Sequence, residues 1–208
     1  MVPFLRAVLL PVQYLNTHLH ELSHAFVALA TGGEVERILV FANGSGVTPV
    51  RGGNIVFTAS AGYLGATLLG MALIAFSKTP ASAQRSMRFL AVLMAIAMIL
   101  WVRGDIVGLI TGFVWVGLLA WQPLLKGQGY VYAAQFLGIQ QCLASLGSVL
   151  GLVQLSAATE VHSDAMILQQ STGIPAVAWA VLWTVVSLVA LGFTARASWR
   201  HRPVPIRA

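Results

Sequence analysis

The chain has 208 residues, of which 58% are hydrophobic and only 9% are charged. Soluble domains carry roughly a quarter charged residues, so this composition excludes an ordinary soluble protein, and it is too apolar for a disordered chain. The net charge of +6 does not indicate a nucleic-acid partner, because the basic residues form no dense patch.

Unbroken apolar runs of helix-spanning length predict an all-α membrane protein, since the strands of a barrel would alternate apolar and polar residues. We expect one domain over residues 1–208 with about six transmembrane helices, the first of which ends at Thr31-Gly32-Gly33. The approximate ranges of the six helices are 3–30, 55–76, 87–102, 106–121, 130–155 and 174–195.

A polar, glycine-rich insert of about residues 34–54 follows the first expected helix. Two short β-like runs, 35–41 and 46–50, flank the turn sequence Ala42-Asn43-Gly44-Ser45. This pattern predicts a small β-hairpin insert. Because an isolated hairpin is marginally stable in water, it should lie on the helices or at the membrane interface.

The distribution of Lys and Arg predicts the orientation in the membrane. With six spans, most basic residues lie on the side of the two termini, including those of the basic C-terminal tail, residues 196–208. That side is therefore expected to be cytoplasmic, where the tail can contact the anionic lipids of the bilayer.

The first expected helix contains the sequence His20-Glu21-Leu22-Ser23-His24. Residues four apart share one face of a helix, so the two imidazoles can bind one metal ion. Zn²⁺ suits two nitrogens, one oxygen and an open position for water, on which Glu21 can act as general base. Ionisable residues inside a membrane cost about 2.5–3.5 kcal/mol each and are usually functional. The alternative is a polar helix face that joins the bundle through hydrogen bonds.

Two neighbours of this motif have different expected positions. His18 lies about 200° round the helix from His20 and is not expected to be a ligand. Asn16, four residues before His20, shares the metal face and can orient a ligand or the substrate.

A third metal ligand has to come from another part of the chain. The remaining acidic residues are Glu34, Glu36, Asp105, Glu160 and Asp164. The two glutamates of the hairpin are expected on a solvated face, and Asp105 fits the N-cap of the fourth helix. Asp164 is the preferred ligand, with an N-terminal cap of a short helix as its alternative role. Asp105, or no carboxylate at all, remains an alternative for the metal.

The motif at residues 20–24 resembles that of the site-2 protease family of intramembrane zinc metallopeptidases. Other stretches look like a small bacterial branch of this family, namely residues 31–38, 44–48, 60–65, 163–165 and 172–175, with Trp179 and Trp183. The resemblance covers most of the chain. It implies a multi-pass protein of a bacterial plasma membrane that performs regulated intramembrane proteolysis, hydrolysing transmembrane protein or peptide substrates with Zn²⁺ and Glu21.

The chain departs from the family pattern at the third ligand. The wider family takes this ligand from an Asn-Pro or Leu-Asp-Gly motif in a later span, and no Asp-Gly pair occurs here. The small branch has an aspartate shortly after a Ser-Leu pair, where this chain has Ser148. A second hypothesis is therefore a catalytically degenerate scaffold or metal-binding regulator.

The family also places its zinc nearer the cytoplasmic side than the charge distribution predicts for this chain. A transporter is disfavoured, because the charged residues gather in one motif.

Overall fold

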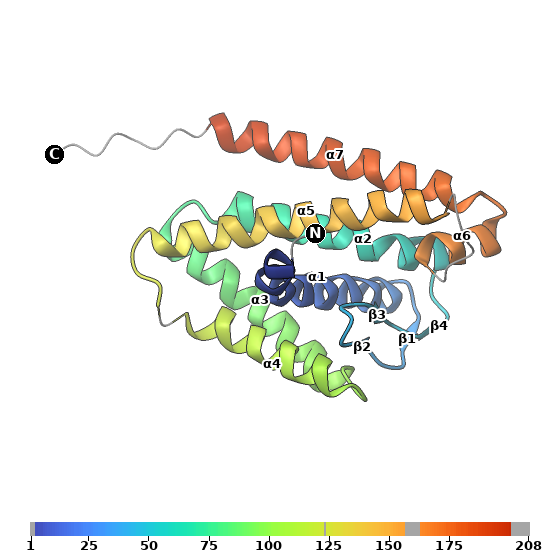
Figure 1. The fold of residues 1–208 in the computed structure, drawn as a ribbon, viewed down its shortest axis with the longest axis horizontal. Helices are drawn as coiled ribbons and strands as arrows, with labels where there is room; N and C mark the ends of the chain where they lie inside the picture. The colour runs from blue at the N-terminus through green and yellow to red at the C-terminus, as the bar shows by residue number, and fades with distance from the viewer. Residues whose placement is uncertain (1–2, 123, 157–162, 201–208) are drawn as a thin grey trace.

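The computed structural model describes residues 3–122, 124–156 and 163–200 as a helical bundle with a small β insert (Figure 1). Its elements in chain order are α1 (Pro3–Ala30), β1 (Glu34–Val35), β2 (Leu39–Val40), β3 (Gly46–Val47), β4 (Val50–Arg51), α2 (Ile55–Phe76), α3 (Pro80–Leu100), α4 (Ile106–Trp121), α5 (Gly129–Ser156), α6 (Asp164–Thr172) and α7 (Ala176–Arg200). The predicted helical fold class and the hairpin insert after the first helix are confirmed.

Two helices differ from the sequence-based expectation. The third helix begins at Pro80 rather than Met87, because Thr79 and Ser82 form a capping box with Pro80 at the first helical position. The polar insert before the last helix contains the nine-residue helix α6, whose N-cap is Ser163 and whose C-cap is Gly173. Glu160 of the same insert and residues 201–208 of the basic tail lie outside the described residues.

The number of membrane spans is confirmed only in part. Four helices are long and apolar enough to cross a membrane, namely α2, α3, α5 and α7 within their described residues. Helix α4 is apolar but has only 16 residues, which gives about 24 Å of helix against a hydrocarbon core of about 30 Å. Helix α1 carries seven polar residues between positions 16 and 24, and they lower its hydropathy. The total of six spans stays a prediction.

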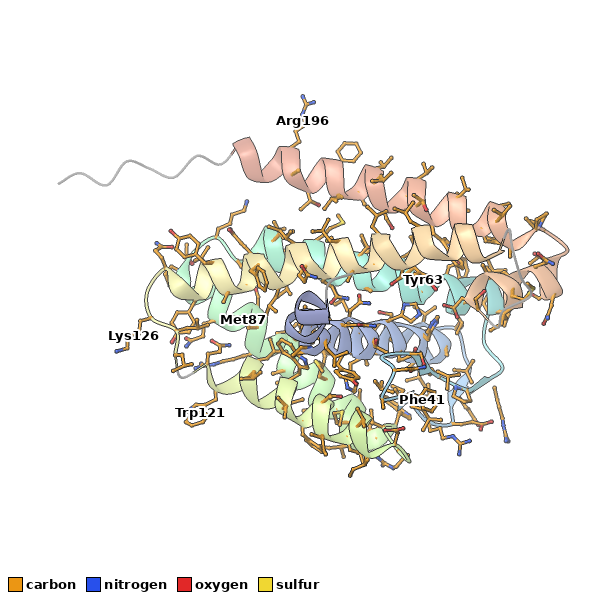
Figure 2. The ribbon with its side chains drawn as sticks, in the orientation of Figure 1. Phe41, Tyr63, Met87, Trp121, Lys126 and Arg196 are labelled. Atoms are coloured by element: carbon orange, nitrogen blue, oxygen red, sulfur yellow. The ribbon has the colours of Figure 1, made fainter. Side chains whose placement is uncertain are left out.

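The outer faces of the bundle are strongly apolar. Large hydrophobic side chains on α3, α4 and α7 are at least half exposed, among them Phe89, Ile99, Ile110, Phe113, Leu182 and Val189. Figure 2 shows Trp121 projecting away from the bundle and Met87 lying within it. An exposed apolar surface of this extent is typical of contact with lipid.

Helix α2 lies at the centre of the packing, where it contacts α1, α5 and α7. A buried cluster joins α1, α3, α4 and α5 through residues such as Leu19, Met87 and Trp115. A second cluster joins α2, α5, α6 and α7 around Leu168 and Trp183. The two clusters pack both α1 and α6 against α2, and this arrangement positions the site described below.

The hairpin packs along α1, and side chains of α1 donate hydrogen bonds to its backbone carbonyl groups. The first helix ends in a Schellman motif, in which the Gly33 N–H donates to the Ala28 carbonyl and Gly32 adopts a φ of 83°. The chain then turns back, and Tyr14 donates to the Ala42 carbonyl at 2.8 Å while Thr17 donates to the Gly44 carbonyl at 2.7 Å. The insert therefore rests on the helix that carries the His20–His24 motif, as expected for a hairpin too small to be stable alone.

Candidate metal centre

Three potential ligand atoms from two distant parts of the chain converge on one point. The Nε2 atoms of His20 and His24 are 3.0 Å apart. Oδ2 of Asp164 lies 3.2 Å from the first and 3.4 Å from the second. In a tetrahedral zinc site with bonds of about 2.0–2.1 Å, neighbouring ligand atoms are about 3.3 Å apart. The donor set and its spacing therefore fit a zinc ion.

The orientation of His24 is fixed from α2. Its Nδ1 donates a hydrogen bond of 2.7 Å to the carbonyl of Thr58, since a carbonyl can only accept. This bond leaves the lone pair of neutral His24 on Nε2, the atom that faces His20 and Asp164. A hydrogen bond from the non-ligating nitrogen to a backbone carbonyl is the usual support of a metal-bound histidine.

Asp164 reaches the two imidazoles from the start of α6. Its neighbour Ser163 caps that helix by accepting from the Met166 N–H, so Asp164 is the first helical residue and not the cap. Its Oδ2 faces the Nε2 atoms of both imidazoles, and the carboxylate is the form of aspartate that binds metal ions.

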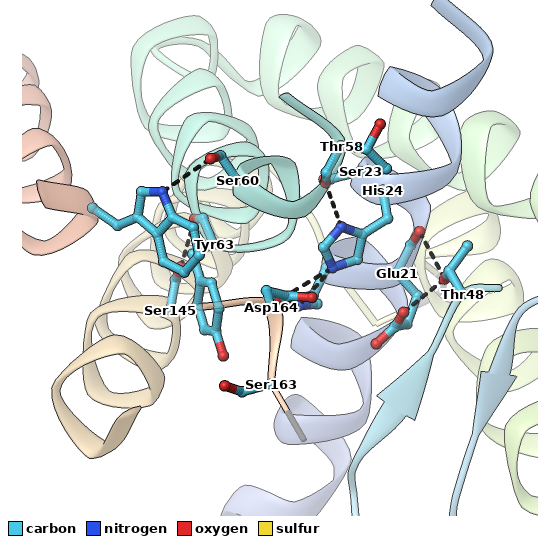
Figure 3. Close-up of polar contacts among 12 residues, drawn as sticks. Glu21, Ser23, His24, Thr48, Thr58, Ser60, Tyr63, Ser145, Ser163 and Asp164 are labelled. Atoms are coloured by element: carbon cyan, nitrogen blue, oxygen red, sulfur yellow. Dashed lines mark hydrogen bonds and ion pairs between the residues drawn. The ribbon is translucent and has the colours of Figure 1, made fainter. Parts of the chain in front are cut away.

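Glu21 is almost fully buried between α1 and the hairpin. Its Oε2 accepts a hydrogen bond of 2.6 Å from the hydroxyl of Thr48. Gly46 leaves space for the carboxylate, because a Cβ at that position would lie 2.5 Å from Oε1 of Glu21. Figure 3 shows Glu21 on the side of Thr48, with His24 and Asp164 next to it. The hairpin thus orients the residue that the sequence predicts as general base.

A cavity of about 690 Å³ opens beside these residues. Its walls come from α1, the hairpin, α2, α5 and α6, and they include His20, Glu21, His24 and Asp164. The volume is sufficient for a segment of extended peptide, because ligand pockets typically measure about 300–1,000 Å³. The predicted site residues therefore share one accessible space.

The other candidates of the sequence lie elsewhere. Asp105 caps α4 by accepting from the Val107 and Gly108 N–H groups, as its capping role predicted. Glu36 forms an exposed ion pair with Arg51, and Glu34 is exposed on β1. His18 faces α4, where its Nε2 lies 3.1 Å from Oγ1 of Thr111. None of these four residues is part of the group that could hold a metal ion among the described residues.

Ser148 stands where the family pattern suggests an aspartate. It lines the cavity, and its hydroxyl donates to the Ala144 carbonyl of its own helix. Asp164 reaches the two histidines from α6, so a carboxylate is present next to them despite this departure.

Several neighbours of the site have no local sequence signal. Thr48 and Thr58 contact Glu21 and His24 from 27 and 34 residues away. Gln141 of α5 donates a buried hydrogen bond of 2.7 Å to Oδ1 of Asn16, which lines the cavity. The rings of Tyr63 and His20 make a T-shaped contact with centroids 4.6 Å apart. These contacts arise only from the packing of helices that are distant in sequence.

Because Gly62 of α2 has no side chain, the imidazoles of His20 and His24 can occupy the positions described above. A methyl group at this position would lie 2.5 Å from Nε2 of His24, and it would also overlap the His20 ring. We expect Gly62→Ala to remove most of the bound zinc, measured by mass spectrometry of the purified protein. Gly117→Ala is the matched control, because a Cβ there meets nothing within 4 Å. Equal zinc content in both variants would contradict this packing.

Comparison with known proteins gives one match. The sequence model of the family described as Peptidase M50B-like matches residues 2–194. This range includes the His20–His24 motif, the hairpin and Asp164. No curated protein and no solved structure matches the chain.

Proposed function

Because the chain belongs to the Peptidase M50B-like family, and so to the site-2 proteases, we propose that it is an intramembrane zinc metalloendopeptidase that cleaves transmembrane proteins or peptides. Family membership and its four long apolar helices make it an integral membrane protein. The observation that carries the proposal is the convergence of two imidazole nitrogens and one carboxylate oxygen beside Glu21 in an accessible cavity.

In this proposal His20, His24 and Asp164 hold the zinc ion, and Glu21 moves the proton. A bound zinc ion would polarise the peptide carbonyl and lower the pKa of a water molecule. Glu21 accepts a proton from the attacking water at its carboxylate and delivers it to the amine that leaves. One C–O bond forms, the C–N bond breaks, and one water is consumed.

The hairpin provides a surface on which an unwound substrate can lie. Residues 44–48 line the cavity, and β3 pairs with β2 along one edge, while no strand pairs with its other edge within the described residues. A peptide added to that edge would be extended, so its carbonyl groups would be accessible to attack. A hairpin that only fills the interface is the alternative role.

The membrane and the orientation are part of the proposal. We place the protein in a bacterial plasma membrane with the basic C-terminal tail, residues 196–208, in the cytoplasm, on the basis of the family resemblance and the distribution of Lys and Arg.

The direct test uses the wild-type protein purified in detergent. We expect about one zinc ion per chain by mass spectrometry, together with cleavage of a single-span substrate that a chelator abolishes and added Zn²⁺ restores. Bound zinc without cleavage of any substrate in a panel of single-span proteins would favour the degenerate scaffold or metal-binding regulator. Cleavage that is insensitive to chelation would contradict the zinc mechanism.

A further inference from the structure

Tyr63 of α2 presents a phenol group to the cavity beside the metal centre. Its ring packs edge-on against His20, with centroids 4.6 Å apart and planes at 81°. The residue lines the cavity, and Figure 3 shows its hydroxyl extending past Asp164 on the side of Ser163. Among the described residues the hydroxyl has no hydrogen-bond partner, so its proton is available to a molecule bound in the cavity.

The ring of Tyr63 is held rigidly. The face of the ring stacks on Trp183, with centroids 5.2 Å apart and an interplanar angle of 26°. Trp183 is in turn fixed by a hydrogen bond of 3.1 Å from its Nε1 to Oγ of Ser60. The backbone carbonyl of Tyr63 accepts a further bond of 2.8 Å from Ser145 of α5. A donor fixed in this way needs no reorganisation during a reaction, which is the condition for strong electrostatic stabilisation.

Two of the other hydroxyl groups on the cavity wall are engaged, and Oγ1 of Thr58, which has no partner, is itself fully buried. Thr48 donates its proton to Glu21 and Ser148 donates to the Ala144 carbonyl. Asn16 retains amide protons, because its Oδ1 accepts from Gln141, but it lies one helical turn before His20, about 6 Å along α1. The Tyr63 ring contacts a proposed ligand directly, so we take Tyr63 rather than Asn16 as the donor to the reacting carbonyl.

We propose that the Tyr63 hydroxyl is a catalytic hydrogen-bond donor, which stabilises the oxyanion that forms when water adds to the scissile carbonyl. The inference rests on the proposed function. The role is distinct from those of Glu21, which moves protons, and of the three proposed ligands. Tyr63 keeps its own proton and stabilises negative charge only in the transition state and the tetrahedral intermediate.

The test is Tyr63→Phe, which removes the hydroxyl and keeps the ring between His20 and Trp183. Tyr132→Phe is the matched control, because Tyr132 is 69% exposed on α5. For Tyr63→Phe we expect unchanged zinc content, a kcat lower by about 100- to 1,000-fold and little change in KM. Affinity for a phosphinic peptide, whose tetrahedral anionic group mimics the oxyanion, should fall by a comparable factor. The control should behave like the wild type in all four measurements.

The other outcomes overturn the inference in distinguishable ways. Unchanged kcat and unchanged phosphinic-peptide affinity in Tyr63→Phe would show that the hydroxyl does not stabilise the oxyanion, while the proposed function would stand. Loss of zinc in Tyr63→Phe would show that the hydroxyl supports the metal site instead. A wild-type protein with neither zinc nor cleavage would overturn the proposed function and the role of Tyr63 with it.

Discussion

Glu21→Gln should retain the bound zinc and lose peptide cleavage by about 100- to 10,000-fold, the usual contribution of a general acid–base group. The amide has nearly the same size and shape as the carboxylate but cannot accept a proton from water. His20, His24 and Asp164, which would hold the ion, are unchanged. The measurements are zinc per chain by mass spectrometry and the initial rate of cleavage of a single-span substrate in detergent.

The packing around Glu21 explains why the folded structure should tolerate this variant. Thr48 donates to Oε2 of Glu21 at 2.6 Å, and the carbonyl oxygen of a glutamine can accept the same hydrogen bond. Glu36→Gln is the matched control, because it makes the same change in an exposed ion pair on the hairpin. An unchanged cleavage rate in Glu21→Gln would remove this residue from the mechanism, and loss of zinc would show that it supports the metal site.

The sequence predicts the parts of the site that depend on local geometry. The spacing of His20 and His24 places both imidazoles on one face of α1, because this face repeats every three to four residues. Asp105 is correctly predicted as the N-cap of α4, since capping also depends on neighbouring residues. The start of α3 also has a local signal, although the apolar pattern alone predicts a later start at Met87. The capping box formed by Thr79 and Ser82 begins the helix before its uninterrupted apolar stretch.

The remaining parts depend on tertiary packing, which the sequence does not specify by any local rule. Asp164 is 144 residues from His20, and no local pattern distinguishes it from Asp105 as the third ligand. The contacts of Thr48 with Glu21 and of Gln141 with Asn16 require the hairpin and α5 to dock on α1. The position of Gly62 opposite the imidazoles becomes visible only once α1 and α2 are placed together.

Asp164→Asn should weaken zinc binding by more than about 100-fold. Loss of an outer-shell partner typically costs about 10- to 100-fold in metal affinity, and this change removes the charge of a direct ligand in the proposed site. The neutral amide keeps the size of the side chain, and Ser163 still caps α6. The measurement is competition for Zn²⁺ with a chromogenic chelator, using the purified protein in detergent.

Asp105→Asn is the matched control, because it makes the same change in a carboxyl group that caps a helix. Asp105 accepts from the Val107 N–H at 2.8 Å, and asparagine is an equally good N-cap, so α4 and zinc affinity should be unaffected. A ligand that binds only the native state also stabilises it. A chelator should therefore lower the melting temperature of the wild type and of Asp105→Asn, but not that of Asp164→Asn at the same zinc concentration. Wild-type zinc affinity in Asp164→Asn, with a loss in Asp105→Asn, would move the third ligand to the start of α4 and contradict the site proposed here.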